Sequence, residues 1–115
     1  ECPVQYTGRR VTTEGVLHGQ PVRRGDLVIA LIGAANRDPA QHERPDELDI
    51  GRAPRPSLAF GTGPHVCLGA ALTMLEGEAL LRRLIDRRPD LRLVDAQPRW
   101  TGSPLYRGLA SLPLR

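Results

Sequence analysis

The sequence predicts an α+β fold in which short strands flank a long coil and a single long helix. Short runs rich in Val, Thr and Tyr, broken by glycines, fill the first part of the chain, and such runs are typical of short strands and turns. Four prolines then interrupt residues 37–59, which argues against regular structure there. Leucines recur near helical spacing between residues 68 and 88, which indicates the helix.

The composition argues against a self-sufficient core. A chain of 115 residues suits one small domain, yet it has one Phe, one Trp, two Tyr and one Met to fill an interior. Its eleven prolines and twelve glycines together exceed the usual share of roughly 12 per cent. Such a composition is typical of a loop-rich piece that packs on a cofactor or on more chain.

Charge and hydropathy exclude two classes of partner. All sixteen basic residues are Arg, scattered among thirteen acidic residues, whereas nucleic-acid binding needs a basic stripe or a known module. No apolar run approaches the eighteen residues of a membrane-spanning helix, and no secretory leader is recognisable. We therefore expect a cytoplasmic protein without nucleic-acid or membrane partners, in which Cys2 and Cys67 are free thiols.

The elements before the helix follow in chain order. Residues 1–26 predict a sheet region of short strands, with a turn at 24–26. The apolar run 27–36 predicts a short strand that leads into a short helix. Residues 37–59 predict a long ordered coil, and coils of this length inside compact domains are usually functional or disordered. Residues 60–69 form a glycine-rich loop.

The last two segments are the helix and the tail. Residues 68–88 predict the helix, which Pro89 ends and whose C-terminal dipole Arg87 and Arg88 complement. Residues 89–115 predict two or three short strands, in which we expect Trp100 and Tyr106 to pack.

The loop FGTGPHVCLG gathers three glycines, a proline, a histidine and Cys67 in ten residues. Cys67 stands at the start of the predicted helix, where unpaired N–H groups and the dipole stabilise a thiolate. Glycines let the backbone approach a flat or bulky partner, because no side chain intervenes. The pattern predicts a loop that presents a thiolate outward, and the alternative is a buried cysteine that acts as a small hydrophobe.

Three other uses of the loop stay open. His65 is two residues from Cys67 and could serve as the base of a nucleophilic cysteine, although residues at this spacing seldom face each other. A zinc site needs three or four protein ligands, and the two cysteines and three histidines lack paired spacing. The third possible use is a phosphate-binding loop at a helix N-terminus, but the glycine spacing of this loop differs from the GxxxxGK[ST] motif.

The loop resembles the Cys-ligand loop of the cytochrome P450 superfamily, the haem-thiolate monooxygenases. The family pattern is Phe, Gly, x, Gly, x, His or Arg, x, Cys, x, Gly, and every fixed position is matched, by Phe60, Gly61, Gly63, His65, Cys67 and Gly69. Residues 3–26, 31–61 and 69–81 resemble the sheet region, meander and following helix of soluble bacterial members. The resemblance implies the C-terminal part of the mainly α P450 fold, with short sheet segments, meander coil, ligand loop, long helix and C-terminal β-hairpin.

The resemblance implies a haem b site. Cys67 would be the axial thiolate ligand of the iron, pushing electron density toward the metal. His65 and Arg9 would pair with the haem propionates, and Arg10 is the neighbour that could replace Arg9. Phe60 would shield the haem and the thiolate, and the loop glycines would make room for the porphyrin.

Further positions carry weaker implications. Arg52 aligns with the meander arginine that ties this coil to the family's ExxR helix, and Asn36–Pro39 match a recurrent meander entry. Leu48 replaces the meander's usual Phe, and Thr73-Met74 replace the Ala-Arg common after the ligand. His18 and His42 lie in polar loops and are expected to be solvated. A helix face is also expected to be solvated, although it could instead meet an acidic redox partner; it consists of Arg82, Arg83, Arg87 and Arg88.

The resemblance implies a monooxygenase that inserts one oxygen atom of dioxygen into a small organic substrate. Electrons would come from NAD(P)H through a ferredoxin- or flavodoxin-type donor. We expect no catalytic residue in this chain, because the family's acid–alcohol pair, ExxR helix and substrate-recognition loops have no counterpart in it; the remainder of a P450 chain is therefore an expected partner. The alternative is a non-catalytic haem-binding or structural remnant of a truncated gene, and a third hypothesis is a phosphate-binding domain.

Overall fold

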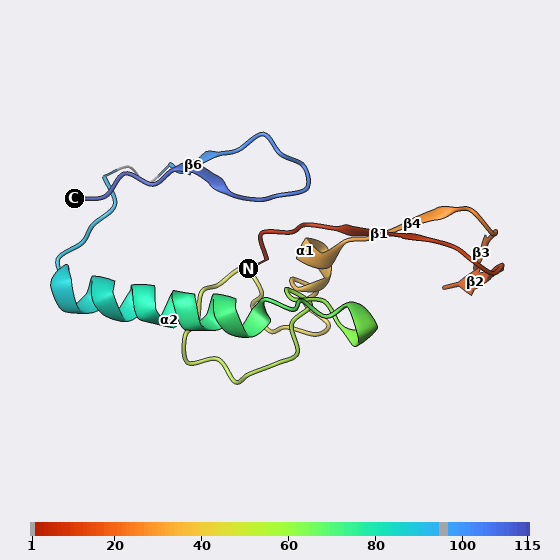
Figure 1. Cartoon of the computed structure of the whole chain (residues 1–115), viewed down its shortest axis with the longest axis horizontal. Coiled ribbons are helices and arrows are strands. Elements are labelled where there is room, and N and C mark those ends of the chain that lie inside the picture. Colours follow the sequence, from red (N-terminus) through yellow and green to blue (C-terminus); the bar gives the residue numbers. More distant parts are fainter. Residues whose placement is uncertain (1, 95–96) are drawn as a thin grey trace. The chain divides into compact units, whose positions relative to one another are not determined.

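The computed structural model describes residues 2–94 and 97–115. The chain divides into two units, one of Glu1–Ala59 with Pro104–Arg107 and the other of Phe60–Ser103 with Gly108–Arg115. The elements run from strands β1–β4 and helix α1 through a coil and a 3₁₀ turn, η1, to helix α2 and strands β5 and β6 (Figure 1). The predicted sheet region and tail include residues 1, 95 and 96, which lie outside the described residues.

Two antiparallel strand pairs open the first unit. Strand β1 (Thr7–Arg10) pairs with β4 (Leu27–Ala30), and between them in sequence β2 (Gly15–Leu17) pairs with β3 (Gln20–Val22). Figure 1 shows the β2–β3 hairpin at the far end of the β1–β4 pair. These elements confirm the predicted short strands.

The β2–β3 hairpin turns through two residues with left-handed backbone. His18 has φ 47° and Gly19 has φ 78°, as a type I′ turn requires, and this turn matches the twist of the flanking strands. His18 is exposed, as expected for a residue at a hairpin tip.

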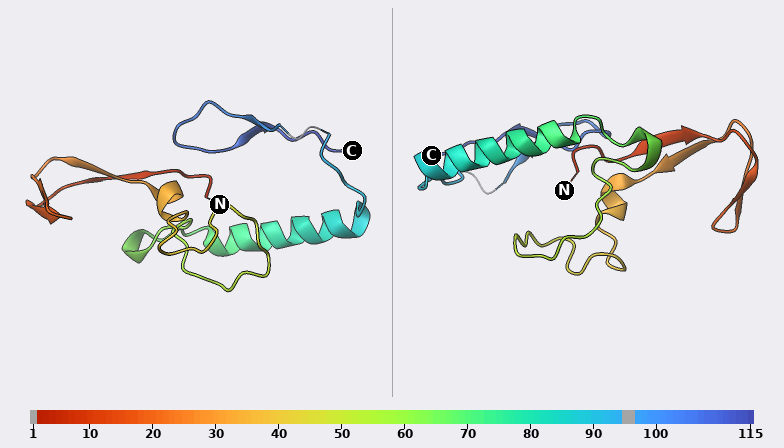
Figure 2. Two further views of the ribbon diagram at one scale, coloured as in Figure 1. Left: turned by 180° about the vertical axis from the view of Figure 1, so that it is seen from behind. Right: turned by 60° about the horizontal axis from the view of Figure 1, so that its bottom comes forward.

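Helix α1 (Ile32–Ala35) directly follows β4, which confirms the predicted strand and short helix. The coil from 37 to 59 then contains no helix or strand, as its prolines predicted. The two views in Figure 2 show it as open loops after α1. Its ends are joined because the Leu58 N–H donates to Asn36 Oδ1 at 2.8 Å.

Helix α2 (Ala70–Arg87) dominates the second unit and runs unbroken for 18 residues (Figure 1). It begins at Ala70 instead of residue 68 because Gly69 takes the N-cap position, with its carbonyl accepting the Thr73 N–H at 2.9 Å. It ends at Arg87, one residue before the predicted end, with Arg88 as C-cap. Pro89 follows and cannot extend the helix.

The tail forms one short antiparallel pair, β5 (Arg99–Trp100) with β6 (Leu109–Ser111), and an isolated bridge joins Leu93 to Leu114. This confirms the predicted C-terminal hairpin. The expectation that Tyr106 packs in the tail sheet is wrong, because Tyr106 forms a bridge with Val4 in the first unit. Residues 104–107 leave the hairpin to pair with the N-terminal segment, where Gln5 N–H donates to the Leu105 carbonyl at 2.8 Å.

Burial is sparse in the described part of the chain. Cys2 is its one buried side chain, whereas Leu48, Ile50 and Leu68 are almost fully exposed. This agrees with a composition that lacks the aromatic residues to fill a core. In the same described residues, no helix combines the length and apolar character needed to cross a bilayer.

Candidate functional site

The loop from Phe60 to Gly69 is closed by its own backbone. The Cys67 N–H donates to the Phe60 carbonyl at 2.8 Å, and the Val66 N–H donates to the Gly63 carbonyl at 3.1 Å. Between these bonds the chain makes the 3₁₀ turn η1 (Gly63–His65), with a proline near its start. Proline suits this position because it lacks only an N–H that the turn leaves unpaired.

Two glycines of the loop hold left-handed backbone conformations. Gly61 has φ 70° and Gly63 has φ 74°, a region that costs a residue with a side chain roughly 1–2 kcal/mol. A Cβ on Gly63 would meet nothing within 4 Å, and one on Gly61 would lie 3.8 Å from the His65 carbonyl oxygen. Glycine is therefore required at both places by the backbone, with no contact inside the chain that excludes a methyl group.

Cys67 is exposed and its thiol is free. It lies three residues before Ala70, and its carbonyl accepts the Ala70 N–H at 3.3 Å. The sulfur therefore stands beside the N-terminus of α2, close to the N-cap residue Gly69. The described residues thus leave the Cys67 side chain uncovered, and its role as an outward-presented thiolate stays a prediction.

The surroundings of the thiol are apolar and open. Val66 and Leu68, on either side of Cys67, expose 54% and 101% of their side chains, and Phe60 is half-buried. A Cβ on Gly69 would begin 3.9 Å from the Cys67 sulfur. The loop thus presents one sulfur donor flanked by apolar side chains, with little bulk beside it.

Among the described residues, no group of three or more His, Cys, Asp or Glu side chains is placed to hold a metal ion. A zinc site, which needs three or four protein ligands, therefore has no support within residues 2–94 and 97–115. A metal that takes a single ligand from this chain is compatible with the arrangement.

The other predicted haem contacts are divided between the two units. His65 ends η1 in the second unit, in the same loop as Cys67, and is exposed. Arg9 lies on β1 in the first unit, where its guanidinium donates to Thr7 Oγ1 at 2.8 Å and to the Gly8 carbonyl at 2.9 Å. The pairing of His65 and Arg9 with haem propionates stays a prediction.

Arg10 has a local structural contact. Its guanidinium donates to the Gly25 carbonyl at 2.7 Å, at the turn before β4. The side chain therefore ties β1 to the turn at 24–26, which agrees more closely with a structural residue than with a substitute for Arg9.

Arg52 organises the coil that precedes the loop. Its guanidinium donates to the carbonyls of Glu43, Arg44 and Glu47, the last two at 3.0 Å. A planar fork with five N–H donors can reach several carbonyls at once. One side chain thus holds a turn of backbone in which Arg44 has φ 47°. The predicted tie to an ExxR helix stays a prediction.

Replacing Arg52 by Ala is expected to loosen this coil and to speed its cleavage by a protease, because three backbone carbonyls lose their donor. Each charged hydrogen bond is worth about 1.5–3 kcal/mol when buried, and less at this partly exposed site. Arg52→Lys should restore only part of the protection from cleavage, because an ammonium lacks the planar fork of donors.

Mass spectrometry of limited-proteolysis fragments measures cleavage within residues 37–59. Arg55→Ala, which removes one longer bond to the Gln41 carbonyl at 3.3 Å, is the matched control. Equal cleavage in all variants would contradict the assignment.

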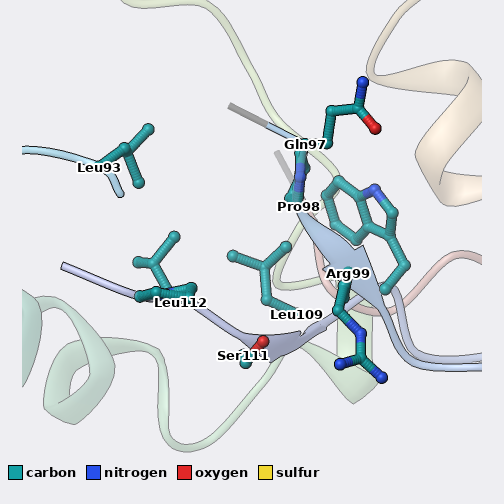
Figure 3. A pocket seen from close by; sticks show the side chains of 9 residues that line it. Leu93, Gln97, Pro98, Arg99, Leu109, Ser111 and Leu112 are labelled. Atoms are coloured by element: carbon teal, nitrogen blue, oxygen red, sulfur yellow. The ribbon is translucent and has the colours of Figure 1, made fainter. Parts of the chain in front are cut away.

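A second apolar feature lies in the tail. The tail forms an open pocket of about 290 Å³, around which Figure 3 shows Leu93, Pro98, Leu109 and Leu112. Trp100 also lines it, which agrees with its expected packing in the tail. Most of its described lining is apolar, with Gln97, Arg99 and Ser111 as the polar residues, and we assign the pocket to packing.

One structural role near the loop has no counterpart in the sequence-based predictions. Cys2 is a free thiol, as predicted, but it is also buried and its sulfur contacts two carbonyl oxygens. One of these belongs to Ala59, 57 residues away. No local pattern in the sequence predicts a contact between residues this far apart.

Known proteins match nearly the whole chain. The family model described as Cytochrome P450 matches residues 2–88. The biotin biosynthesis cytochrome P450 of Bacillus subtilis (strain 168) is 42% identical over 99% of this chain, and cytochrome P450 107B1 of Saccharopolyspora erythraea is 46% identical over all of it. In each case the chain spans 29% of the length of the curated relative.

Solved structures agree with this match. The structure of P450BioI in complex with an acyl carrier protein that bears hexadec-9Z-enoic acid has a TM-score of 0.93 and 41% identity, and it covers 99% of this chain and 30% of its own. The structure of CYP109E1 from Bacillus megaterium in complex with testosterone has a TM-score of 0.92 and 35% identity, and the match covers 98% of this chain and 32% of that structure's chain. These matches confirm the predicted partial fold of small antiparallel sheets and one long helix.

Proposed function

The chain belongs to the cytochrome P450 family, and on this premise we propose that it is the C-terminal, thiolate-bearing portion of a haem-dependent monooxygenase. The whole enzyme would insert one oxygen atom of dioxygen into a small organic substrate, and Cys67 would supply the thiolate that holds the haem iron. The observation that carries the proposal is the free, exposed thiol of Cys67 in a glycine loop just before α2.

The loop residues fit a haem. Cys67 offers a soft sulfur donor, which suits iron that a porphyrin already holds. Val66 and Leu68, the sequence neighbours of Cys67, expose apolar side chains, and a Cβ on Gly63 would meet nothing within 4 Å. A flat, mostly apolar macrocycle with a central metal needs a donor, an apolar surface and clearance in one place.

The backbone of the loop orients the thiolate. The hydrogen bond from Cys67 N–H to the Phe60 carbonyl fixes the residue that carries the sulfur. Gly69, two residues after Cys67 in the chain, is the N-cap of α2, so the ligand residue lies just before a long helix. Gly69, whose Cβ would begin 3.9 Å from the sulfur, keeps that side clear. The half-buried Phe60 would shield the thiolate.

His65 and Arg9 would bind the haem propionates through charge-assisted hydrogen bonds. His65 is exposed in the ligand loop. The local bonds of Arg9 to Thr7 and Gly8 come from one nitrogen, Nη1, and a guanidinium has five N–H donors. Donors are therefore left for a carboxylate.

When bound, the haem supplies the oxidation chemistry, using electrons from NAD(P)H that a ferredoxin- or flavodoxin-type protein delivers. The part assigned to this chain is to hold and orient a thiolate and to donate to propionates. We assign no proton-transfer residue among the described residues, and this step belongs to the remainder of the P450 chain.

The substrate is proposed only as a small organic molecule. The names of the relatives refer to biotin biosynthesis, to an acyl carrier protein that bears a fatty acid, and to testosterone. These molecules share little chemistry, and kinship of fold carries no substrate specificity.

The proposal is tested on the full-length protein that carries this chain, purified and reconstituted with haem. We expect one haem per chain by the pyridine haemochrome assay and a thiolate-type Soret band in the reduced carbon monoxide complex. An imidazole-type spectrum, or no haem binding, would rule out the proposed site. Isotopically labelled dioxygen separates the enzyme from a non-catalytic haem-binding remnant, which would show the band but transfer no oxygen to any substrate of a screened set.

A further inference from the structure

Cys2 is held at both its side chain and its main chain. Its side chain is 2% exposed, and it is the one buried side chain within residues 2–94 and 97–115. The sulfur lies 2.9 Å from the carbonyl oxygen of Val4 and 3.6 Å from that of Ala59. The carbonyl of Cys2 in turn accepts a hydrogen bond from Gln5 Nε2 at 2.6 Å.

The contact with Ala59 reaches the ligand loop through the covalent chain. Ala59 is the residue before Phe60, and its carbonyl shares one planar peptide group with the Phe60 N–H. The carbonyl of Phe60 itself accepts the Cys67 N–H at 2.8 Å. The Ala59 carbonyl thus faces the Cys2 thiol, and the next carbonyl along the chain, that of Phe60, accepts from Cys67.

We propose that Cys2 is a positioning residue for the Cys67 loop, because its thiol fixes the Ala59 carbonyl at the point where the loop begins. This inference rests on the proposed function, since the task of the loop is to place the Cys67 thiolate. A thiol is a weak donor with one proton, which Cys2 shares between the carbonyls of Val4 and Ala59. The low polarity around a buried thiol strengthens such a hydrogen bond.

The test uses the full-length haem-loaded protein with three substitutions of Cys2. Cys2→Ala removes the donor and volume, Cys2→Val removes the donor and fills the site with a slightly larger apolar side chain, and Cys2→Ser keeps a hydroxyl donor. Hydrogen exchange by mass spectrometry on the peptide 60–67 reports the loop without depending on activity. The share of the carbon monoxide complex with a thiolate-type Soret band, read during mild urea treatment, reports the ligand.

We expect Cys2→Ala and Cys2→Val to speed amide exchange in 60–67 by roughly 2- to 10-fold, the effect of one net hydrogen bond. Both should also lose the thiolate-type band at lower urea, and Cys2→Ser should stay closer to the wild type. If Cys2→Val matches the wild type while Cys2→Ser does not, Cys2 acts by packing and the proposal is wrong. It is also wrong if all three variants match the wild type.

The two proposals fail in different ways. If the wild-type protein lacks the thiolate-type band, the proposed function is wrong, and hydrogen exchange in 60–67 still decides the role of Cys2. If the wild-type band is normal and exchange is unchanged in the Cys2 variants, only the inference about Cys2 is wrong. Should Cys2→Ala fail to fold, the comparison of Cys2→Ser with Cys2→Val still separates hydrogen bonding from packing.

Discussion

Replacing Cys67 by Ala in the full-length protein is expected to abolish the thiolate-type Soret band of the reduced carbon monoxide complex. The substitution removes the one sulfur that this loop presents. Changes around a metal ligand typically cost about 10–100-fold in affinity or activity, and loss of the ligand itself should cost more. Cys67→Ser should also lose the band, because a neutral hydroxyl is a poorer iron ligand. The measurement is the difference spectrum, together with oxygen transfer to substrate.

Leu68→Ala is the matched control for Cys67. Leu68 is the next residue and its side chain is 101% exposed, so its truncation removes apolar surface without removing a donor. We expect this variant to keep the thiolate-type band because the sulfur donor remains, while its haem affinity falls with the lost apolar surface. A band that survives in Cys67→Ala would mean that another group ligates the iron.

Gly63→Ala is expected to weaken the ligand loop even though the added methyl group has free space. Gly63 holds φ 74°, and a residue with a Cβ pays roughly 1–2 kcal/mol in this region. Nothing lies within 4 Å of the added carbon, so the cost comes from the backbone alone. The measurement is the urea concentration at which the thiolate-type band is half lost, which should fall in the variant.

Gly102→Ala separates backbone strain from the mere addition of a methyl group. Gly102 also has nothing within 4 Å of an added Cβ, but its φ lies outside the left-handed range. We expect little change in the same measurement, and equal losses in the two variants would refute the backbone explanation. A haem-free preparation adds a second check, because strain at Gly63 should lower stability without haem as well. An effect confined to the haem-loaded protein would instead indicate a clash with the porphyrin.

Much of the local structure could be predicted because its causes are local. Pro39, Pro45, Pro54 and Pro56 restrict their own backbone and that of the preceding residues, so the coil follows from the sequence alone. The leucine spacing and Pro89 predict the helix to within two residues at each end. The glycine loop was likewise readable, because the order of Phe, Gly, His and Cys is a strongly specific pattern.

Contacts between distant segments could not be predicted. The Cys2 thiol meets the Ala59 carbonyl across 57 residues, and Tyr106 forms a bridge with Val4 instead of joining the tail sheet. Neither contact can be predicted from hydrophobic periodicity or composition, because each depends on how the chain returns to its own N-terminal segment. The three carbonyls that Arg52 binds could not be predicted either. Every residue has a backbone carbonyl, so the sequence does not indicate which carbonyls a side chain will reach.

Apolar side chains of α2 are exposed among the described residues. Leu72, Leu75, Leu80 and Leu81 are each at least half exposed. The chain spans 29% of the length of its curated relatives. Experiments on function therefore belong on the full-length protein.

The central claim, that Cys67 ligates the haem iron, is tested most directly by X-ray absorption spectroscopy at the iron edge of the full-length protein. We predict a sulfur scatterer in the first coordination shell of the wild type that is absent from Cys67→Ser and retained in Cys2→Ser. A shell of nitrogen and oxygen alone in the wild type, or a sulfur that persists in Cys67→Ser, would contradict the claim.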